Sequence, residues 1–200
     1  MDWITEPEAL EALYGTPGEA ARRKVTPQLT PAYRAWIERA RFCVLSTVGP
    51  EGTDGSPRGD DGPVVAVLDD GTLALPDWQG NQRLDSLRNI LRDGRVSLMF
   101  LIPGSHNAMR VNGTARLTAD PGLCARFEKE GKRPRTVIVI AIAEVYSQCA
   151  RALIRAGFWT GDQAQGLPTV GDMLREITQG GIDGAAYDAQ WPARAAGTMW

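Results

Sequence analysis

The stretch LALPDWQGNQRLDSLRNIL, residues 73–91, contains the transition that decides the fold. An apolar, strand-like run ends at Pro76, and a polar corner follows it. Residues 80–93 then carry apolar side chains at helical spacing, so we expect an amphipathic helix there. A strand that enters a helix through this corner would place the polar residues at the helix N-terminus.

The corner carries groups that suit an anion. A helix N-terminus exposes unpaired N–H groups and a partial positive charge. Asn81 is expected to cap the helix, and Gly80 allows close approach to the backbone. A plain helix cap explains both residues, but it does not explain Arg83, because a cation is unfavourable at this end of the helix dipole. A phosphate beside Arg83 would reverse that preference, so the pattern favours a phosphate site.

Short strands joined by turns surround the corner. Apolar and β-branched runs predict six strands, at residues 42–48, 62–68, 72–75, 95–102, 108–118 and 136–146. The cluster GPEGTDG after the first run is expected to be a turn. Because hairpins connect these strands, we expect a mainly β antiparallel barrel with flanking helices.

The remaining segments are expected to be arms of one domain that spans residues 1–200. Residues 1–40 predict a helical arm, with Thr30 as an N-cap followed by Pro31. Residues 147–200 are expected to form a helical or extended arm. The last part, residues 181–200, shows no clear period and is expected to be extended.

Composition excludes several functional classes. The net charge of −2 gives no reason to expect a nucleic acid or a membrane surface as partner. The acidic N-terminus lacks the pattern of a secretion signal, and the three cysteines are widely separated, so we expect reduced thiols and a cytoplasmic location. His106 is the single histidine, which disfavours histidine-dependent hydrolases and zinc or iron sites. No metal is expected, and a cofactor would carry any chemistry.

Two further polar clusters interrupt the apolar pattern. Residues 56–62, SPRGDDG, include Arg58 and fit either a solvated turn or a binding loop. Residues 109–115, MRVNGTA, place Arg110 and Asn112 on one face of a strand. That face suits a heterocycle edge or a phosphate, but an exposed edge strand has the same pattern.

In their order, SPRGD, LPDWQGNQRLDSLRNIL, RVSLMFLIPG and MRVNGTARL resemble the flavin-binding split barrels related to pyridoxamine 5′-phosphate oxidase. The resemblance runs from about Arg34 to about Trp159. It implies a six-stranded antiparallel split β-barrel, the FMN-binding split barrel. It also implies a homodimer with two FMN sites at the subunit interface.

The resemblance assigns the first part of the cofactor site. Arg58, Gly59 and Asp60 would line the flavin. Pro76 and Asp77 would lie near the edge of the isoalloxazine ring.

The phosphate and the ribityl chain would be held by Asn81 and Arg83, which match the region that grips them in the family. The lysine that usually follows is Leu84 in this chain. One cation must therefore come from elsewhere, and Arg58 is the best candidate.

The remaining assignments involve the second subunit. Arg110 and Asn112 would match the strand that reaches the cofactor from one subunit. Trp159 would match an aromatic wall that the partner donates, although core packing or a dimer anchor also explains such a residue.

The C-terminus departs from the family pattern. The ending QWPARAAGTMW does not match the segment with which pyridoxamine phosphate oxidases bind their substrate, so the vitamin B6 reaction is not implied. We therefore expect an FMN-dependent oxidoreductase acting on an unknown small molecule or redox donor, with catalytic residues unassigned. The alternatives are a flavin- or haem-binding carrier or sensor without turnover, and a reductase that uses the deazaflavin F420.

Overall fold

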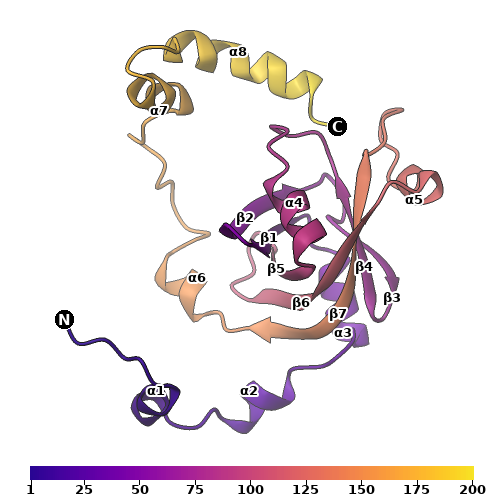
Figure 1. The fold of residues 1–200 in the computed structure, drawn as a ribbon, viewed down its shortest axis with the longest axis vertical. Coiled ribbons are helices and arrows are strands. Elements are labelled where there is room, and N and C mark those ends of the chain that lie inside the picture. Colours follow the sequence, from indigo (N-terminus) through magenta and orange to yellow (C-terminus); the bar gives the residue numbers. More distant parts are fainter.

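The computed structural model describes residues 1–200 and contains one antiparallel sheet that curls into a barrel (Figure 1). Its strands are β1 (Phe42–Gly49), β2 (Gly52–Gly59), β3 (Ala66–Asp69), β4 (Thr72–Asp77), β5 (Arg95–Leu101), β6 (Ala108–Thr118) and β7 (Thr136–Gln148). They are hydrogen-bonded in the order β2-β1-β5-β6-β7-β4-β3. The prediction of a mainly β, antiparallel split barrel with flanking helices is confirmed.

The sheet has seven strands, not the six expected, because residues 52–59 form β2 and not a turn. The pairing of β1 with β2 runs without a break from Phe42 opposite Gly59 to Gly49 opposite Gly52. Glycine, aspartate and proline disfavour strands, but β2 lies at the edge of the sheet, where Pro57 need not donate to a second neighbour. Arg58 therefore lies on a strand.

Eight helices flank the sheet: α1 (Pro7–Tyr14), α2 (Glu19–Arg23), α3 (Pro31–Ile37), α4 (Asp85–Arg92), α5 (Pro121–Ala125), α6 (Arg151–Arg155), α7 (Val170–Ile177) and α8 (Gly184–Gly197). In Figure 1, α1 and α2 extend away from the barrel on one side, and α7 with α8 lies on another. The predicted cap of α3 is confirmed, since Thr30 Oγ1 accepts a hydrogen bond from the Tyr33 N–H at 3.2 Å. None of the helices is both long and apolar enough to cross a bilayer.

The C-terminal segment is helical, so the expectation of an extended final part is wrong. The side chain of Asp183 accepts from the Ala186 N–H at 3.1 Å and caps α8. Gly184 is the one buried residue of α8, so the helix has no apolar stripe that a periodicity could reveal. Its alanine content favours the helix all the same.

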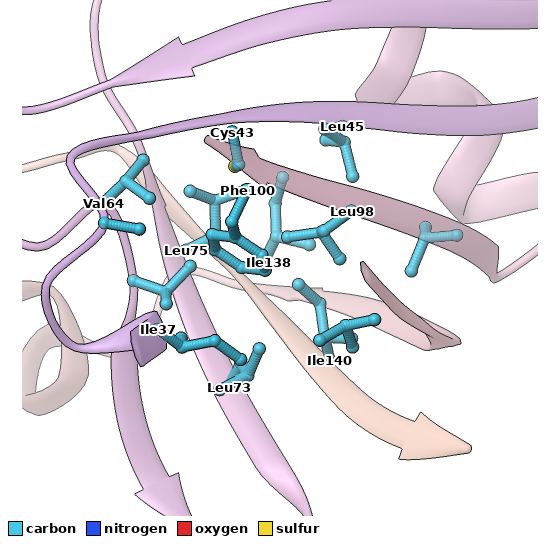
Figure 2. Packing of buried hydrophobic residues seen from close by; sticks show 14 of the residues in the cluster. Ile37, Cys43, Leu45, Val64, Leu73, Leu75, Leu98, Phe100, Ile138 and Ile140 are labelled. Carbon is cyan, nitrogen blue, oxygen red and sulfur yellow. The ribbon is translucent and has the colours of Figure 1, made fainter. Parts of the chain in front are cut away.

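The barrel interior is filled by alternating side chains of the strands (Figure 2). The fully buried side chains that point toward one another in this view include Cys43, Leu45, Leu73, Leu98, Phe100, Ile138 and Ile140. Burying each large apolar side chain contributes about 1.5–3 kcal/mol before the entropy of ordering is counted. This packing makes the barrel a rigid support for the loops at its ends.

Helix α4 is fixed to the barrel by polar as well as apolar contacts. Ser86 Oγ donates to Asp54 Oδ2 of β2 at 2.5 Å, and Asn89 Nδ2 donates to Thr47 Oγ1 of β1 at 3.1 Å. Both bonds are part-buried, so they resist competition from water. The start of α4 is thereby held against β2.

The apolar face predicted for this helix is only partly correct. Ile90 is buried and Leu87 packs against the core. Leu84 and Leu91 are exposed. Leu84 precedes the first residue of α4, and the polar anchors Ser86 and Asn89 hold the helix against β2 and β1.

Gly113 gives a test of the β6–β7 pairing. A Cβ at this position would lie 2.1 Å from the backbone oxygen of Ala141, beside the register shift after Asn112. We expect Gly113→Ala to lower the free energy of unfolding by about 1–3 kcal/mol, because backbone atoms must move. The matched control is Gly55→Ala, where a Cβ meets nothing within 4 Å. Equal denaturation midpoints for the two variants would contradict this close approach.

Candidate functional site

A cavity of about 860 Å³ lies at the end of the barrel where β2 and β4 meet the loop before α4. Its walls come from β2, the 78–84 loop, the 132–135 segment and the last two residues, Met199 and Trp200. Figure 1 shows the C-terminus beside the loop between β4 and α4. The volume lies within the range of small-molecule and cofactor sites, about 300–1,000 Å³.

The register between β4 and β7 brings two of these walls together. Asp77, the last residue of β4, pairs with Thr136, the first residue of β7. The chain that leaves β4 and the chain that enters β7 therefore run side by side at one end of the sheet. The polar corner of residues 78–84 thus faces a basic segment that is distant in sequence.

Arg58 and Asp77 form an ion pair across the cavity end of the barrel. They belong to β2 and β4, which have four strands between them in the sheet order. Their side chains are only 17% and 18% exposed, so water screens the pair weakly. The Nε atom of Arg58 is buried and has no protein acceptor. The guanidinium therefore closes the barrel and keeps one donor without a partner.

The loop before α4 differs from the predicted helix start. Helix α4 begins at Asp85, so Asn81 does not cap it and Arg83 is not in its first turn. Asn81 Oδ1 instead accepts from the Arg83 N–H at 3.1 Å, and Arg83 Nε donates to Asp85 Oδ2 at 2.8 Å. Asp85 supplies the negative charge that the helix end favours, so the dipole argument for an anion at Arg83 no longer holds.

Two residues on either side of Arg83 have left-handed backbone conformations. Gln82 has φ 60° and Leu84 has φ 62°. Residues other than glycine, asparagine and aspartate seldom adopt such backbone angles. Each costs on the order of 1–3 kcal/mol. The left-handed Leu84 also explains why the helix begins later than its sequence suggests. Strain of this kind on a cavity wall points to a functional constraint on the loop.

Asp60 lies behind the cavity wall and does not line it. Its side chain is 4% exposed and pairs with Lys129 Nζ. It also accepts from Trp78 Nε1 at 3.1 Å and from the Gly62 N–H at 2.9 Å. Desolvation lowers the pKa of Lys129, but the hydrogen bonds to Asp60 and Asp61 outweigh it, and the pKa is raised. Asp60 therefore holds the Trp78 side chain in position through this hydrogen bond.

Trp78 and Trp200 form an aromatic corner of the cavity. Their ring centroids are 5.2 Å apart in an edge-to-face arrangement. Lys129 Nζ lies 4.4 Å from the centroid of the Trp200 ring. Sequence reasoning left Trp78 without a role and missed Trp200, because their contact requires the C-terminus to return to the barrel.

The predicted residues on β6 and after α6 lie away from this cavity. Arg110 lies over the Tyr146 ring, with 5.5 Å between the guanidinium carbon and the ring centroid. Asn112 Nδ2 donates to Glu144 Oε1 at 2.6 Å, and its Oδ1 is buried without a partner. Trp159 Nε1 donates to a backbone oxygen of the loop after β5 at 2.6 Å. The structure thus joins Arg58, Gly59, Pro76, Asp77, Asn81 and Arg83 at the cavity and separates these three from it.

The Cys43 thiol, close to Arg58, is not a reactive group. Burial raises the pKa of Cys43 to about 12, despite the nearby Arg58, so the thiol stays protonated at neutral pH. No group of three or more His, Cys, Asp or Glu side chains converges as a metal site.

The basic segment of the cavity wall was missed by sequence reasoning. Lys132, Arg133 and Arg135 all line the cavity. The run KRPR was visible in the sequence, but its location depends on the β4–β7 register, which the sequence does not specify.

Comparison with known proteins gives one family. The family model described as pyridoxamine 5′-phosphate oxidase matches residues 29–149, which include all the cavity walls except Met199 and Trp200. No curated protein matches the chain.

Several solved structures are similar to the chain. HupZ of Group A Streptococcus is 18% identical, covers 60% of this chain and 93% of its own, and has a TM-score of 0.48. A Lactobacillus delbrueckii protein provisionally named a pyridoxamine 5′-phosphate oxidase is 25% identical over 60% of this chain and 95% of its own, with a TM-score of 0.49. An FMN-binding protein from Syntrophomonas wolfei is 17% identical over 58% and 88%, with a TM-score of 0.44.

The ion pair between Arg58 and Asp77 can be tested by a double-mutant cycle. Asp77→Asn should lower the free energy of unfolding by about 1–3 kcal/mol, because a shielded guanidinium loses its counter-charge. Adding Arg58→Met should restore part of that loss. The control pair Arg92 and Glu51 is 49% and 72% exposed, and its coupling energy should be about 0–1 kcal/mol. Additive effects of Arg58→Met and Asp77→Asn would show that the pair does not close the barrel.

Proposed function

The chain belongs to the pyridoxamine 5′-phosphate oxidase family, and on this premise we propose that it binds FMN in the cavity and acts as an FMN-dependent oxidoreductase. The observation that carries the proposal is that the family match includes the β2, 78–84 and 132–135 walls of a cofactor-sized cavity. The substrate is a small molecule or a redox donor.

The residues present fit a flavin phosphate. Five cationic side chains line the cavity against three acidic ones, which leaves an excess of positive charge for an anion. Arg58 Nε offers a buried donor without a protein acceptor. Trp78 supplies an aromatic surface of the kind that packs against flat rings.

Each residue has a part in this proposal. Bound flavin supplies hydride and electron transfer. Asn81 and Arg83 bind the phosphate and the ribityl chain, and Arg58 with Gly59 contacts the flavin. Pro76 and Asp77 lie near the ring edge, while Asp60 fixes Trp78 in place. No histidine lines the cavity. Water or the substrate itself would therefore donate or accept any proton that the reaction requires.

The outer face of the sheet supports a homodimer. The register aligns Val44, Met99, Arg110 and Tyr146 in one row across β1, β5, β6 and β7. The next row holds Ser46, Ser97, Asn112 and Glu144. Asn112 Oδ1 is buried without a partner on this face, and Met99 is 38% exposed. In our proposal a second copy covers this face, so that Arg110, Asn112 and Trp159 reach the cofactor of the neighbouring subunit.

Arg83→Ala tests the phosphate assignment. We expect FMN binding, followed by quenching of flavin fluorescence, to weaken by about 1.5–3 kcal/mol because charge-assisted hydrogen bonds are lost. Unchanged affinity would remove Arg83 from the site. If the native protein shows neither bound flavin absorption nor quenching of added FMN, the proposed function is wrong. A haem or deazaflavin spectrum of the purified protein would identify the other cofactors.

Turnover has its own measurement. The FMN-loaded protein should be reduced by NADH or NADPH, or by another small donor, at a rate above that of free FMN. A bound flavin that no donor reduces would identify a carrier or sensor instead of an enzyme.

The dimer is tested by sedimentation. The native chain should have twice the mass of one 21.7 kDa subunit, and Met99→Arg should yield monomers because it buries an unpaired charge beside Arg110 in the proposed interface. Met173→Arg is the matched control, since Met173 is 49% exposed on α7, outside the proposed interface. A monomeric native protein would refute the dimer proposal.

A further inference from the structure

The segment 132–135 is held in a fixed conformation on the cavity wall. Lys129 and Lys132 exchange two backbone hydrogen bonds, of 2.9 and 2.8 Å, around residues 130–131, whose φ angles are 51° and 76°. Two consecutive positive φ angles are typical of the tightest hairpin turns. The Asp60–Asp61 pair holds Lys129 Nζ, and Pro134 is buried. The backbone that carries Lys132, Arg133 and Arg135 is therefore well anchored.

Most of the positive charge in the cavity is already neutralised. Three of the five cationic side chains have a carboxylate partner: Arg58 with Asp77, Arg83 with Asp85 and Arg133 with Glu128. Lys132 and Arg135 have none. The charge left for an external anion is thus concentrated on these two residues.

The chemistry of the two residues indicates the ligand class. Arg135 offers a planar fork that binds two oxygens at once, and Lys132 offers a compact point charge. A phosphate monoester carries about −1.5 to −2 charges at neutral pH and three acceptor oxygens. Two unpaired cations match a dianion of this kind, whereas a carboxylate would neutralise only one of them.

We propose that Lys132 and Arg135 form a phosphate-binding patch that takes a phosphate monoester dianion. This chain has Leu84 where the family usually has a lysine, so the 78–84 loop lacks one cation. Lys132 and Arg135 supply that positive charge, a role that the sequence analysis assigned to Arg58. Arg58 cannot fill that part fully, because Asp77 already neutralises it across the barrel. The inference rests on the proposed function to the extent that the phosphate of FMN is the ligand. A second phosphorylated ligand in the same cavity has the same chemistry.

The double variant Lys132→Ala/Arg135→Ala tests the patch with two flavins. FMN affinity should fall by about 10- to 100-fold, the loss expected for one or two charge-assisted hydrogen bonds. Riboflavin lacks the phosphate, and its affinity should stay within about twofold of the native value. Both side chains are exposed, so the variant should fold normally, which circular dichroism checks.

The matched control is Arg116→Ala/Arg126→Ala. It removes the same charge from two exposed residues that lie outside the cavity and form no ion pair. An equal loss of FMN affinity in this control would show a general charge effect and overturn the patch.

A second arm separates the two sources of phosphate. Inorganic phosphate is titrated into the riboflavin-loaded native and double-variant proteins. If FMN affinity is unchanged but phosphate binding is lost in the double variant, the patch serves a second phosphorylated ligand. If neither changes, the proposal is wrong. If the native protein binds neither flavin, the proposed function fails, and phosphate titrated into the unloaded protein still tests the patch.

Discussion

The ion pair between Arg58 and Asp77 is the constraint on which the site depends. It joins strands that share no hydrogen-bond ladder and have four strands between them in the sheet order. Apolar side chains fill the curled sheet, and the charged pair links β2 at one edge to β4, the neighbour of the strand at the other edge. The 78–84 loop begins immediately after Asp77, so the ion pair also fixes the start of this loop against β2.

The second organising feature is a register. Because Asp77 lies opposite Thr136, the loop that leaves β4 and the segment that enters β7 form adjacent walls of one cavity. Asp60 then binds both Trp78 of the 78–84 loop and Lys129 of the turn that precedes residues 132–135. Gln82 and Leu84 keep their strained backbone conformations because the surrounding rigid structure offsets the free-energy cost of the strain.

Much of the fold could be predicted from the sequence, because the buried strands alternate or run apolar and the cap Thr30 follows a local rule. Asp120 obeys the same rule at the start of α5, where its Oδ1 accepts from the Leu123 N–H at 2.7 Å. The site could be predicted only in part. The start of α4 depends on a left-handed Leu84, and Lys132 and Arg135 reach the cavity through pairing between distant strands. Neither property is encoded in a local pattern.

Strand β2 could not be predicted from the sequence, because its glycines, its charged residues and Pro57 are not typical of a strand. The same composition has a consequence for the molecule in solution. An open edge with regular N–H and C=O groups is a template for intermolecular strand addition, the first step of cross-β aggregation. Pro57 removes one donor from that template. The strand that carries the closing arginine thus also protects the barrel against growth into fibrils.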